Sequence, residues 1–353
     1  MRVLFLSNIP SPYQIDFIRG LTGRDDIELF AYFLWRGRTN RKWDLDLRGD
    51  MEIAGFGYKP ADYMKFYRYV KKVDPDIIFM GGYRIPLSIP AVILSKLNKK
   101  RIVLWLERPF ERSGLTGVLK RLYLKIRLAM PDAIVAIGEK AQKIYNAYND
   151  RCFNLPYSMD LERYYKIDRP PDGGDGVDFL FSGQFIERKN VINLVNAFKS
   201  LKHRNIRLTM IGSGELEDRL REEAGSDNRL QIPGFIQPSE LPSVFRKSDV
   251  FVLPSRHDGW GLVVNEAMAS AMPVIGTAEA GAVHEFIRHK ENGYVCDTSP
   301  GSIREGLEYY INNRPLVRRH GRINRELIAK SDADVRNSVK TFSRIMGEVL
   351  LSK

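Results

Sequence analysis

The sequence predicts an α/β protein made of two doubly wound domains, each with a parallel sheet covered by helices on both faces. Short apolar runs typical of buried strands alternate with stretches of helical spacing along the chain, which is the pattern of βαβ units. The alternation pauses at residues 170–176 (PPDGGDG), where proline and glycine disfavour helix and strand, and then restarts. The 353 residues suffice for two domains of about 100–200 residues each.

The first half opens with an apolar run, residues 2–7, which is followed by a loop with two prolines. This order predicts a buried strand, and four more runs of the same kind follow it. The predicted strands are residues 2–7, 27–34, 76–80, 101–106 and 132–137, and the predicted helices are 13–21, 61–73, 90–97 and 117–130. Ligand sites of such sheets lie beyond the carboxyl ends of the strands, so we expect functional residues in the loops that follow them.

The second half shows the same alternation of predicted strands and helices. Its predicted strands are residues 179–182, 207–211, 230–232, 250–253 and 273–276, and its predicted helices are 190–201, 215–224, 239–247 and 261–271. A last helical stretch covers residues 333–351. We therefore predict a first domain over residues 1–165, a linker over 166–178, a second domain over 179–332, and a C-terminal helical segment, 333–353, that packs back on the first domain.

The charge is unevenly distributed. The chain has 55 Lys and Arg against 43 Asp and Glu, which gives a net charge of +12 and a pI near 9.5. Residues 1–165 hold 28 basic and 18 acidic side chains, whereas the rest of the chain holds 27 and 25. An excess of this kind indicates an anionic partner; the alternative is a mildly basic composition without a functional role. Nucleic acid is one candidate, although no recognised DNA- or RNA-binding motif is present, and an anionic membrane face is another.

Residues 117–130 combine Lys120, Arg121, Lys125 and Arg127 with apolar side chains at helical spacing. Such a helix either lies on an anionic membrane or packs its apolar side on the sheet, and residues 61–72 leave the same two alternatives. No apolar stretch reaches the roughly 20 residues that cross a bilayer, and no secretory signal is visible. The two cysteines make no disulfide framework. We expect a cytoplasmic protein that is at most peripheral on the membrane.

The densest motif is residues 254–269 (PSRHDGWGLVVNEAMA), where Asp258 and Glu266 stand eight apart. Glycines between them let the backbone pass close to a ligand, and the free N–H groups of the following helix favour an anion. A carboxylate one turn into that helix is an acceptor suited to sugar hydroxyls. The alternative is that Asp258 caps the helix and Glu266 is solvated.

A second motif is residues 181–190 (FSGQFIERKN), where a strand ends in Gly183 and two cations, Arg188 and Lys189, follow. A glycine turn with cations can bind a diphosphate and stabilise it as a leaving group. The alternative is a surface turn with solvated cations.

Together these two segments resemble the retaining glycosyltransferases of family 4, which have the GT-B fold of two Rossmann-like domains facing a cleft. Asp258 and Glu266 take the places of the family's two acidic residues, although the first is usually glutamate, and Gln184 stands where an arginine is usual. Residues 210–215, 233–236 and 248–255 extend the resemblance over about residues 179–293. Residues 212–217 contain G-x-G but end in Glu217, so the dinucleotide fingerprint is incomplete.

The resemblance implies the roles of single residues. Donor-binding residues would be Gly183, Gln184, Arg188, Lys189, Gly212, Phe235, Ile236, Asp258, Gly259, Trp260, Gly261, Leu262, Val263 and Glu266. By the same resemblance, catalysis would rest on Asp258, Glu266 and Lys189, and the loop with Pro12 and Tyr13 would lie on the acceptor side. Many relatives carry a histidine after the strand that corresponds to residues 101–106, but the first domain of this chain has none, so Glu107 is the catalytic candidate there and Glu107 and Arg108 are acceptor-side candidates. Glu107 follows a predicted strand and can orient or deprotonate an acceptor hydroxyl; the alternative is a loop salt bridge with Arg108 or Arg112. No metal or cofactor is expected.

The resulting expectation is a metal-independent hexosyltransferase that moves a sugar from a UDP- or GDP-sugar to a glycan or lipid-linked hydroxyl, in the synthesis of an envelope, capsule or lipopolysaccharide glycan. Two alternatives stay open. One is another GT-B reaction, either sugar-nucleotide epimerisation or phosphorolysis. The other is a basic nucleic-acid-binding protein without enzymatic activity.

Overall fold

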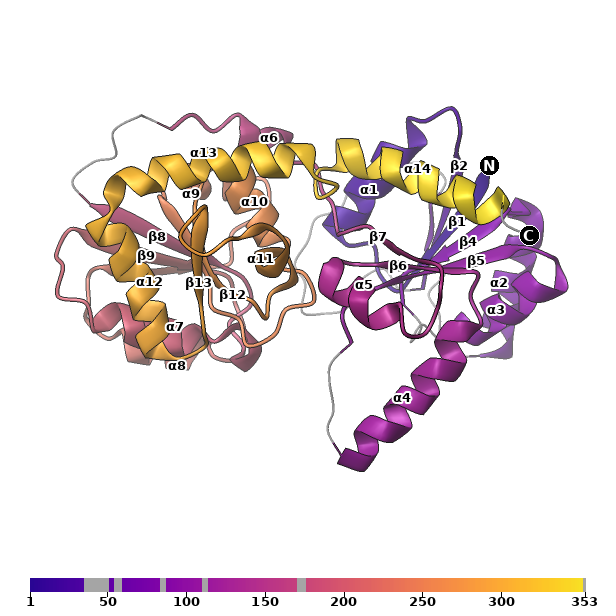
Figure 1. The fold of residues 1–353 in the computed structure, drawn as a ribbon, viewed down its shortest axis with the longest axis horizontal. Helices are drawn as coiled ribbons and strands as arrows, with labels where there is room; N and C mark the ends of the chain where they lie inside the picture. Colours follow the sequence, from indigo (N-terminus) through magenta and orange to yellow (C-terminus); the bar gives the residue numbers. More distant parts are fainter. Residues whose placement is uncertain (35–50, 54–58, 83–86, 110–113, 170–175, 352–353) are drawn as a thin grey trace. The chain divides into compact units, whose positions relative to one another are not determined.

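The structure is a computed structural model that describes residues 1–34, 51–53, 59–82, 87–109, 114–169 and 176–351. For residues 51–53 and 114–121 it describes the backbone alone. The chain divides into two compact units, the first formed by Met1–Asp160 and Val335–Lys353 and the second by Leu161–Asp334. Each unit is an α/β structure, shown with its elements in Figure 1. Among the described helices, none has both the length and the apolarity needed to cross a membrane.

The described residues of the first unit form seven parallel strands. They are β1 (Arg2–Ser7), β2 (Glu28–Phe33), β3 (Met51–Ile53), β4 (Ile77–Met80), β5 (Arg101–Leu106), β6 (Ala133–Ala136) and β7 (Cys152–Asn154), in the order β3-β2-β1-β4-β5-β6-β7. β1 is apolar on both sides, as a strand covered on both faces must be. The order reverses beside β1, so the loop after β1 lies at the switch point of the sheet.

The helices of the first unit are α1 (Pro12–Thr22), α2 (Pro60–Val73), α3 (Ser88–Leu97), α4 (Gly114–Ala129), α5 (Glu139–Tyr145) and α14 (Val335–Leu351). α1 and α14 cover one face, where Phe342 packs edge-on against Phe17 and Phe79 at ring distances of 5.3 and 4.9 Å. α2 to α5 cover the other face and share one core cluster with the sheet, to which Phe66, Val92 and Leu124 belong.

The second unit has six parallel strands among its described residues. They are β8 (Val177–Ser182), β9 (Ile206–Ile211), β10 (Leu230–Gly234), β11 (Val250–Leu253), β12 (Val274–Thr277) and β13 (Gly293–Cys296), in the order β10-β9-β8-β11-β12-β13. Its helices are α6 (Glu162–Tyr165), α7 (Val191–Lys199), α8 (Glu217–Ala224), α9 (Leu241–Arg246), α10 (Val263–Ala269), α11 (Gly281–Phe286), α12 (Pro300–Asn312) and α13 (Arg314–Lys330). The switch point lies between β8 and β11.

The second unit begins at Leu161, ahead of the predicted linker. Leu161, Tyr164 and Ile167 are buried, and Arg169 donates to the carbonyls of Ser248 at 2.6 Å and Phe245 at 2.8 Å. These contacts fasten the start of the predicted linker to the second unit. Residues 170–175 of that linker lie outside the described part of the chain.

Candidate active site

The loops that follow the strands of the second unit meet at one edge of its sheet. After β8, the amide of Gly183 donates to the carbonyl of Ile211 at 3.0 Å. After β9, the amide of Gly212 donates to the carbonyl of Gly234 at 2.9 Å. These two bonds fix the loops after β8, β9 and β10 against one another, at the edge where ligands of doubly wound sheets bind.

Gly212 is the point where two of these loops approach most closely. Its φ is +141°, and a Cβ at this position would lie 1.8 Å from the carbonyl oxygen of Gly183. We therefore expect Gly212→Ala to push the loops apart and to lower the free energy of unfolding by about 3 kcal/mol, measured by chemical denaturation.

Gly234→Ala is the matched control. Gly234 also has a positive φ, +88°, but a Cβ there would meet no atom within 4 Å. Its expected loss is about 1 kcal/mol, from backbone strain alone. Equal losses in the two variants would mean that the left-handed backbone, and not the close approach, makes glycine necessary at residue 212.

A buried ion cluster lies beside these loops. Lys189 Nζ forms an ion pair with Oδ2 of Asp258, while Arg188 Nη1 donates to Oδ1 of Asp258 at 3.1 Å and to the carbonyl of His257 at 2.8 Å. Burial acts to raise the pKa of Asp258, but Lys189 and Arg188 together outweigh it, so this pKa lies below its ordinary value. Two cations thus face one carboxylate, so this cluster of three side chains has a net positive charge.

Main-chain bonds hold the cluster in place. The amide of Asp258 donates to the carbonyl of Glu279 at 3.1 Å, and the amide of Gly281 donates to the carbonyl of Asp258 at 3.2 Å. The amide of Arg256 donates to the carbonyl of Arg188 at 2.8 Å. The loop after β11 is therefore bonded to the loop after β12 and to the short 3₁₀ turn that carries the two cations. Asp258 does not cap α10, because the N-cap of that helix is Leu262.

Glu266 lies on α10 and is 7% exposed, which excludes the alternative of a solvated residue. Its Oε1 accepts a hydrogen bond of 2.5 Å from the hydroxyl of Tyr164. α10 spans Val263–Ala269 and not residues 261–271 as predicted, because Gly261 and Ala271 have positive φ values of +92° and +53°. Tyr164 lies outside the sequence motifs and was not among the predicted site residues.

The remaining predicted donor residues differ in exposure. The side chain of Trp260 is only 2% exposed, and its ring packs edge-on against Phe286 at 5.8 Å, so only its backbone is left to meet a ligand. Phe235 is 38% exposed. Gln184 and Gly259 lie in the loops after β8 and β11; Gln184 is exposed, and Ile236, Leu262 and Val263 are half-buried.

The predicted acceptor residues lie in the first unit, where Pro12 and Tyr13 begin α1 and Glu107 and Arg108 follow β5. Tyr157, which the sequence did not single out, joins two of them. Its ring lies 4.6 Å from that of Tyr13, and burial, then the neighbouring Tyr13 and Glu107, raise its pKa well above the ordinary value. The exposed Glu107 and two tyrosines thus form one cluster at the carboxyl edge of the first sheet.

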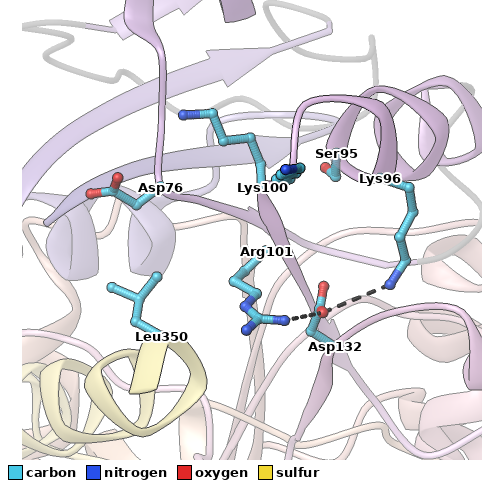
Figure 2. A pocket seen from close by; sticks show the side chains of 8 residues that line it. Asp76, Ser95, Lys96, Lys100, Arg101, Asp132 and Leu350 are labelled. Atoms are coloured by element: carbon cyan, nitrogen blue, oxygen red, sulfur yellow. Dashed lines mark hydrogen bonds and ion pairs between the residues drawn. The ribbon is translucent and has the colours of Figure 1, made fainter. Parts of the chain in front are cut away.

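A pocket of about 420 Å³ in the first unit lies elsewhere. Its lining comes from the amino ends of β4, β5 and β6, with Asp76, Arg101 and Asp132, and from the end of α3, the residues after it and α14 (Figure 2). Asp132 forms ion pairs with Arg101 at 3.0 Å and Lys96 at 3.7 Å. Since this is the opposite edge from the loops after the strands, the pocket is separate from the candidate site. Within the described residues, no group of three or more His, Cys, Asp or Glu side chains is arranged to hold a metal ion.

Comparison with protein families and curated sequences gives one result. Residues 166–327 match the family model described as glycosyl transferases group 1. An uncharacterized glycosyltransferase of Haemophilus influenzae is 33% identical over 260 residues, which cover 71% of each chain. The capsular polysaccharide biosynthesis glycosyltransferase CapM of Staphylococcus aureus is 27% identical over 204 residues, 56% of this chain and 51% of CapM. Two uncharacterized glycosyltransferases of Methanocaldococcus jannaschii are also similar, and this chain covers 48% and 43% of their lengths.

Among solved structures, HepE of Anabaena in complex with UDP has a TM-score of 0.78 over 99% of this chain and 100% of its own. The sequence identity is 14%, so this likeness concerns the fold. The two doubly wound units are those of the GT-B fold, as the sequence predicted.

Proposed function

This chain belongs to the glycosyl transferases of group 1, and we propose that it moves a hexosyl residue from a nucleotide-diphosphate sugar to a hydroxyl acceptor with retention of configuration. The observation that carries the proposal is the cluster of Lys189, Arg188 and Asp258 beside the glycine loops of the second unit. Its positive charge suits a diphosphate. The UDP bound to HepE, a protein of the same fold, supports the same class of donor.

The cluster also suggests how the donor is bound. Lys189 and Arg188 are held by Asp258 in the structure. We propose that the diphosphate takes over both cations, which frees the carboxylate of Asp258 to accept hydrogen bonds from the transferred sugar. Glu266 would accept hydrogen bonds from the ribose, as the family resemblance implies. Backbone groups at Gly183 and Gly212 would lie near the phosphates, since these loops meet at the same edge.

In the proposed reaction, the bond between the anomeric carbon and the phosphate oxygen breaks, and a bond from that carbon to the acceptor oxygen forms on the same face of the sugar. The acceptor proton passes to the leaving phosphate oxygen. Lys189 and Arg188 stabilise the charge that grows on the diphosphate, so the proposed reaction uses these cations in place of a metal.

The acceptor proposal rests on the first unit. The cluster of Tyr13, Tyr157 and Glu107 offers a carboxylate that can orient an acceptor hydroxyl. The name of CapM, a capsular polysaccharide glycosyltransferase, supports an acceptor in the synthesis of a surface glycan. We propose a glycan or lipid-linked glycan as the acceptor, and the cytoplasm as the compartment, where the free thiols of Cys152 and Cys296 stay reduced.

The donor is tested by thermal stabilisation with UDP-, GDP- and CMP-sugars, because a ligand that binds the folded state raises Tm. Product analysis with a labelled sugar donor then identifies the reaction. A glycoside with retained configuration supports the proposal. An epimerised sugar nucleotide or a sugar 1-phosphate would indicate one of the other GT-B reactions. Salt-sensitive binding of nucleic acid without any binding of a nucleotide sugar would indicate a nucleic-acid-binding protein.

We also propose that the first unit attaches to an anionic membrane surface through the outward sides of α2, α3 and α4. All three helices lie on the same face of the sheet, and Arg127 of α4 donates to Oγ of Ser88 of α3 at 2.6 Å. In Figure 1 the amino-terminal part of α4 extends away from the rest of the first unit. The outward sides of the three helices together form the proposed membrane surface.

This surface is both apolar and basic. Eight large apolar side chains on it are 38–75% exposed: Met64, Tyr67, Ile89, Ile93, Leu97, Leu122, Tyr123 and Ile126. The three helices contain nine basic residues and one acidic residue. On the opposite face, α1 and α14 contain four basic and two acidic residues, and Leu351 is their one large apolar side chain exposed among the described residues. The contrast favours contact with anionic lipid.

Vesicle cosedimentation tests this surface. We expect the protein to bind vesicles that contain phosphatidylglycerol and to bind phosphatidylcholine vesicles far less. The double variant Leu122→Ser, Ile126→Ser should bind about tenfold more weakly, since two exposed apolar side chains are lost. Replacing Lys120, Arg121 and Lys125 with glutamine should weaken binding further in the same direction; the side chains of Lys120 and Arg121 lie outside the described part.

Leu351→Ser is the matched control, because Leu351 is 87% exposed but lies on α14, at the other face. Its binding to vesicles should be unchanged. Equal binding by the wild type and by both sets of α4 variants would contradict the proposed attachment.

A further inference from the structure

We propose that Tyr164 is a positioning residue for Glu266: its hydroxyl holds the carboxylate where it can accept hydrogen bonds from the ribose of a bound nucleotide. The inference rests on the proposed function, which gives Glu266 that role. It adds a residue that no motif contains, on α6 at the start of the second unit.

The contact itself is short and buried. The hydroxyl of Tyr164 donates to Oε1 of Glu266 at 2.5 Å. Tyr164 is fully buried, and Glu266 is 7% exposed. Water competes little for a bond in such a place, so it fixes the side-chain torsions of Glu266 more firmly than an exposed bond would. Tyr164 thus limits the positions that the carboxylate can take.

Tyr164 is itself held rigidly. Its ring packs edge-on against Phe245 at 5.4 Å, and the guanidinium of Arg163 lies 5.0 Å from the centre of the ring. The neighbouring chain is fixed by Arg325, which donates to the carbonyl of Ile167 at 2.7 Å. A donor that cannot move is suited to orienting its partner.

The protonation states fit this role. Burial, followed by the charge of Glu266, raises the pKa of Tyr164 well above its ordinary value. The phenol therefore keeps its proton at any pH at which the enzyme would work, and it remains the donor in this bond. Glu266 needs no proton of its own to keep the contact.

The adjacent residue provides a matched control. Tyr165 lies on the same four-residue helix, and its hydroxyl donates to Oδ2 of Asp334 at 2.9 Å. Tyr165→Phe therefore removes one tyrosine hydroxyl and one hydrogen bond to a carboxylate, as Tyr164→Phe does, but it leaves Glu266 untouched. Both variants keep the aromatic ring.

The test measures binding of three probes by calorimetry: the better of UDP and GDP, its 2′,3′-dideoxy analogue, and inorganic pyrophosphate. Tyr164→Phe should weaken binding of the ribonucleotide about tenfold, the effect of one hydrogen bond to a charged group. It should leave binding of the dideoxy analogue and of pyrophosphate within about twofold of the wild type, since neither has ribose hydroxyls for Glu266. Tyr165→Phe should leave all three unchanged.

The outcomes separate the inference from the proposed function. If the wild type binds neither UDP nor GDP, the proposed donor site is wrong. If the wild type binds the ribonucleotide more tightly than the dideoxy analogue and Tyr164→Phe keeps that preference, the positioning role is wrong and the site stands. Unchanged pyrophosphate binding shows that the variant is folded. If Tyr164→Phe does not fold, Glu266→Asp is measured instead, because the shorter side chain draws the carboxylate away from Tyr164. We expect this variant to lose the preference for the ribonucleotide over the dideoxy analogue. A preserved preference would overturn the inference.

Discussion

Replacing Glu266 with glutamine is expected to lower kcat/KM for sugar transfer about a hundredfold and to weaken binding of the nucleotide donor between about tenfold and a hundredfold. Glutamine has nearly the same volume, and its amide oxygen can still accept the hydroxyl of Tyr164, so the buried surroundings of Glu266 are kept. What is lost is the charge, and hydrogen bonds to a charged acceptor contribute about 1.5–3 kcal/mol against about 1 kcal/mol for a neutral one.

Initial rates and donor titrations measure this effect, and denaturation curves should show little change in stability. Glu291→Gln is the control, because Glu291 is an exposed glutamate of the same unit. We expect it to retain full activity. Full activity in Glu266→Gln would mean that Glu266 does not bind the donor. The role that the family resemblance implies for this residue would then be wrong.

The fold was predictable from the sequence because most of the central parallel strands, β1, β4, β5, β6, β11 and β12, are buried on both faces. Such strands have unbroken apolar runs in the sequence, as in residues 3–6 and 250–253, and proline or glycine occurs in the chain between them. The three-residue strands β3 and β7 escaped notice because they are too short to show a period. Residues 161–165 were assigned to the first domain although they belong to the second unit, because contacts such as that of Tyr164 with Glu266 involve residues far along the chain.

The site was predictable only in part. Lys189 and Asp258 were each identified from local motifs, but their ion pair joins residues 69 apart. That pairing follows from β8 and β11 being neighbours in the sheet. Local sequence patterns do not predict the order of strands. Tyr164 shows the same limit more strongly, because it reaches Glu266 across 102 residues and belongs to no motif. Sequence patterns identified the charged groups; the residues that hold them depend on tertiary packing.

Lys189→Met is expected to have two effects at once, loss of transfer and loss of stability, because Lys189 is the main partner of a buried carboxylate. Lys189 and Asp258 are 10% and 12% exposed as side chains. Methionine fills a similar volume but leaves Asp258 with Arg188, which is 39% exposed and pairs less strongly. Removing one partner of a buried pair lowers the free energy of unfolding by about 3–5 kcal/mol.

The two effects can be separated with the double variant Lys189→Met, Asp258→Asn. The amide needs no cation, so most of the lost stability should return, measured by denaturation with the buried Trp260 as a fluorescent reporter. Transfer should stay abolished, because the diphosphate still lacks Lys189 and the transferred sugar now lacks the carboxylate of Asp258. Recovery of activity together with stability would mean that the pair of Lys189 and Asp258 serves the fold and not the donor.

Acid unfolding gives an independent check of the same pair. The folded pKa of Asp258 lies below its ordinary value of 3.8, so its contribution to stability is complete above that pH and is lost as the pH falls through the lowered folded pKa. In Lys189→Met, burial is opposed by Arg188 alone, so the folded pKa rises and the loss begins at a higher pH. The double variant has no carboxylate at residue 258 and should not show this shift. An acid midpoint that is identical in the wild type and Lys189→Met would contradict the ion pair as the source of the stabilisation.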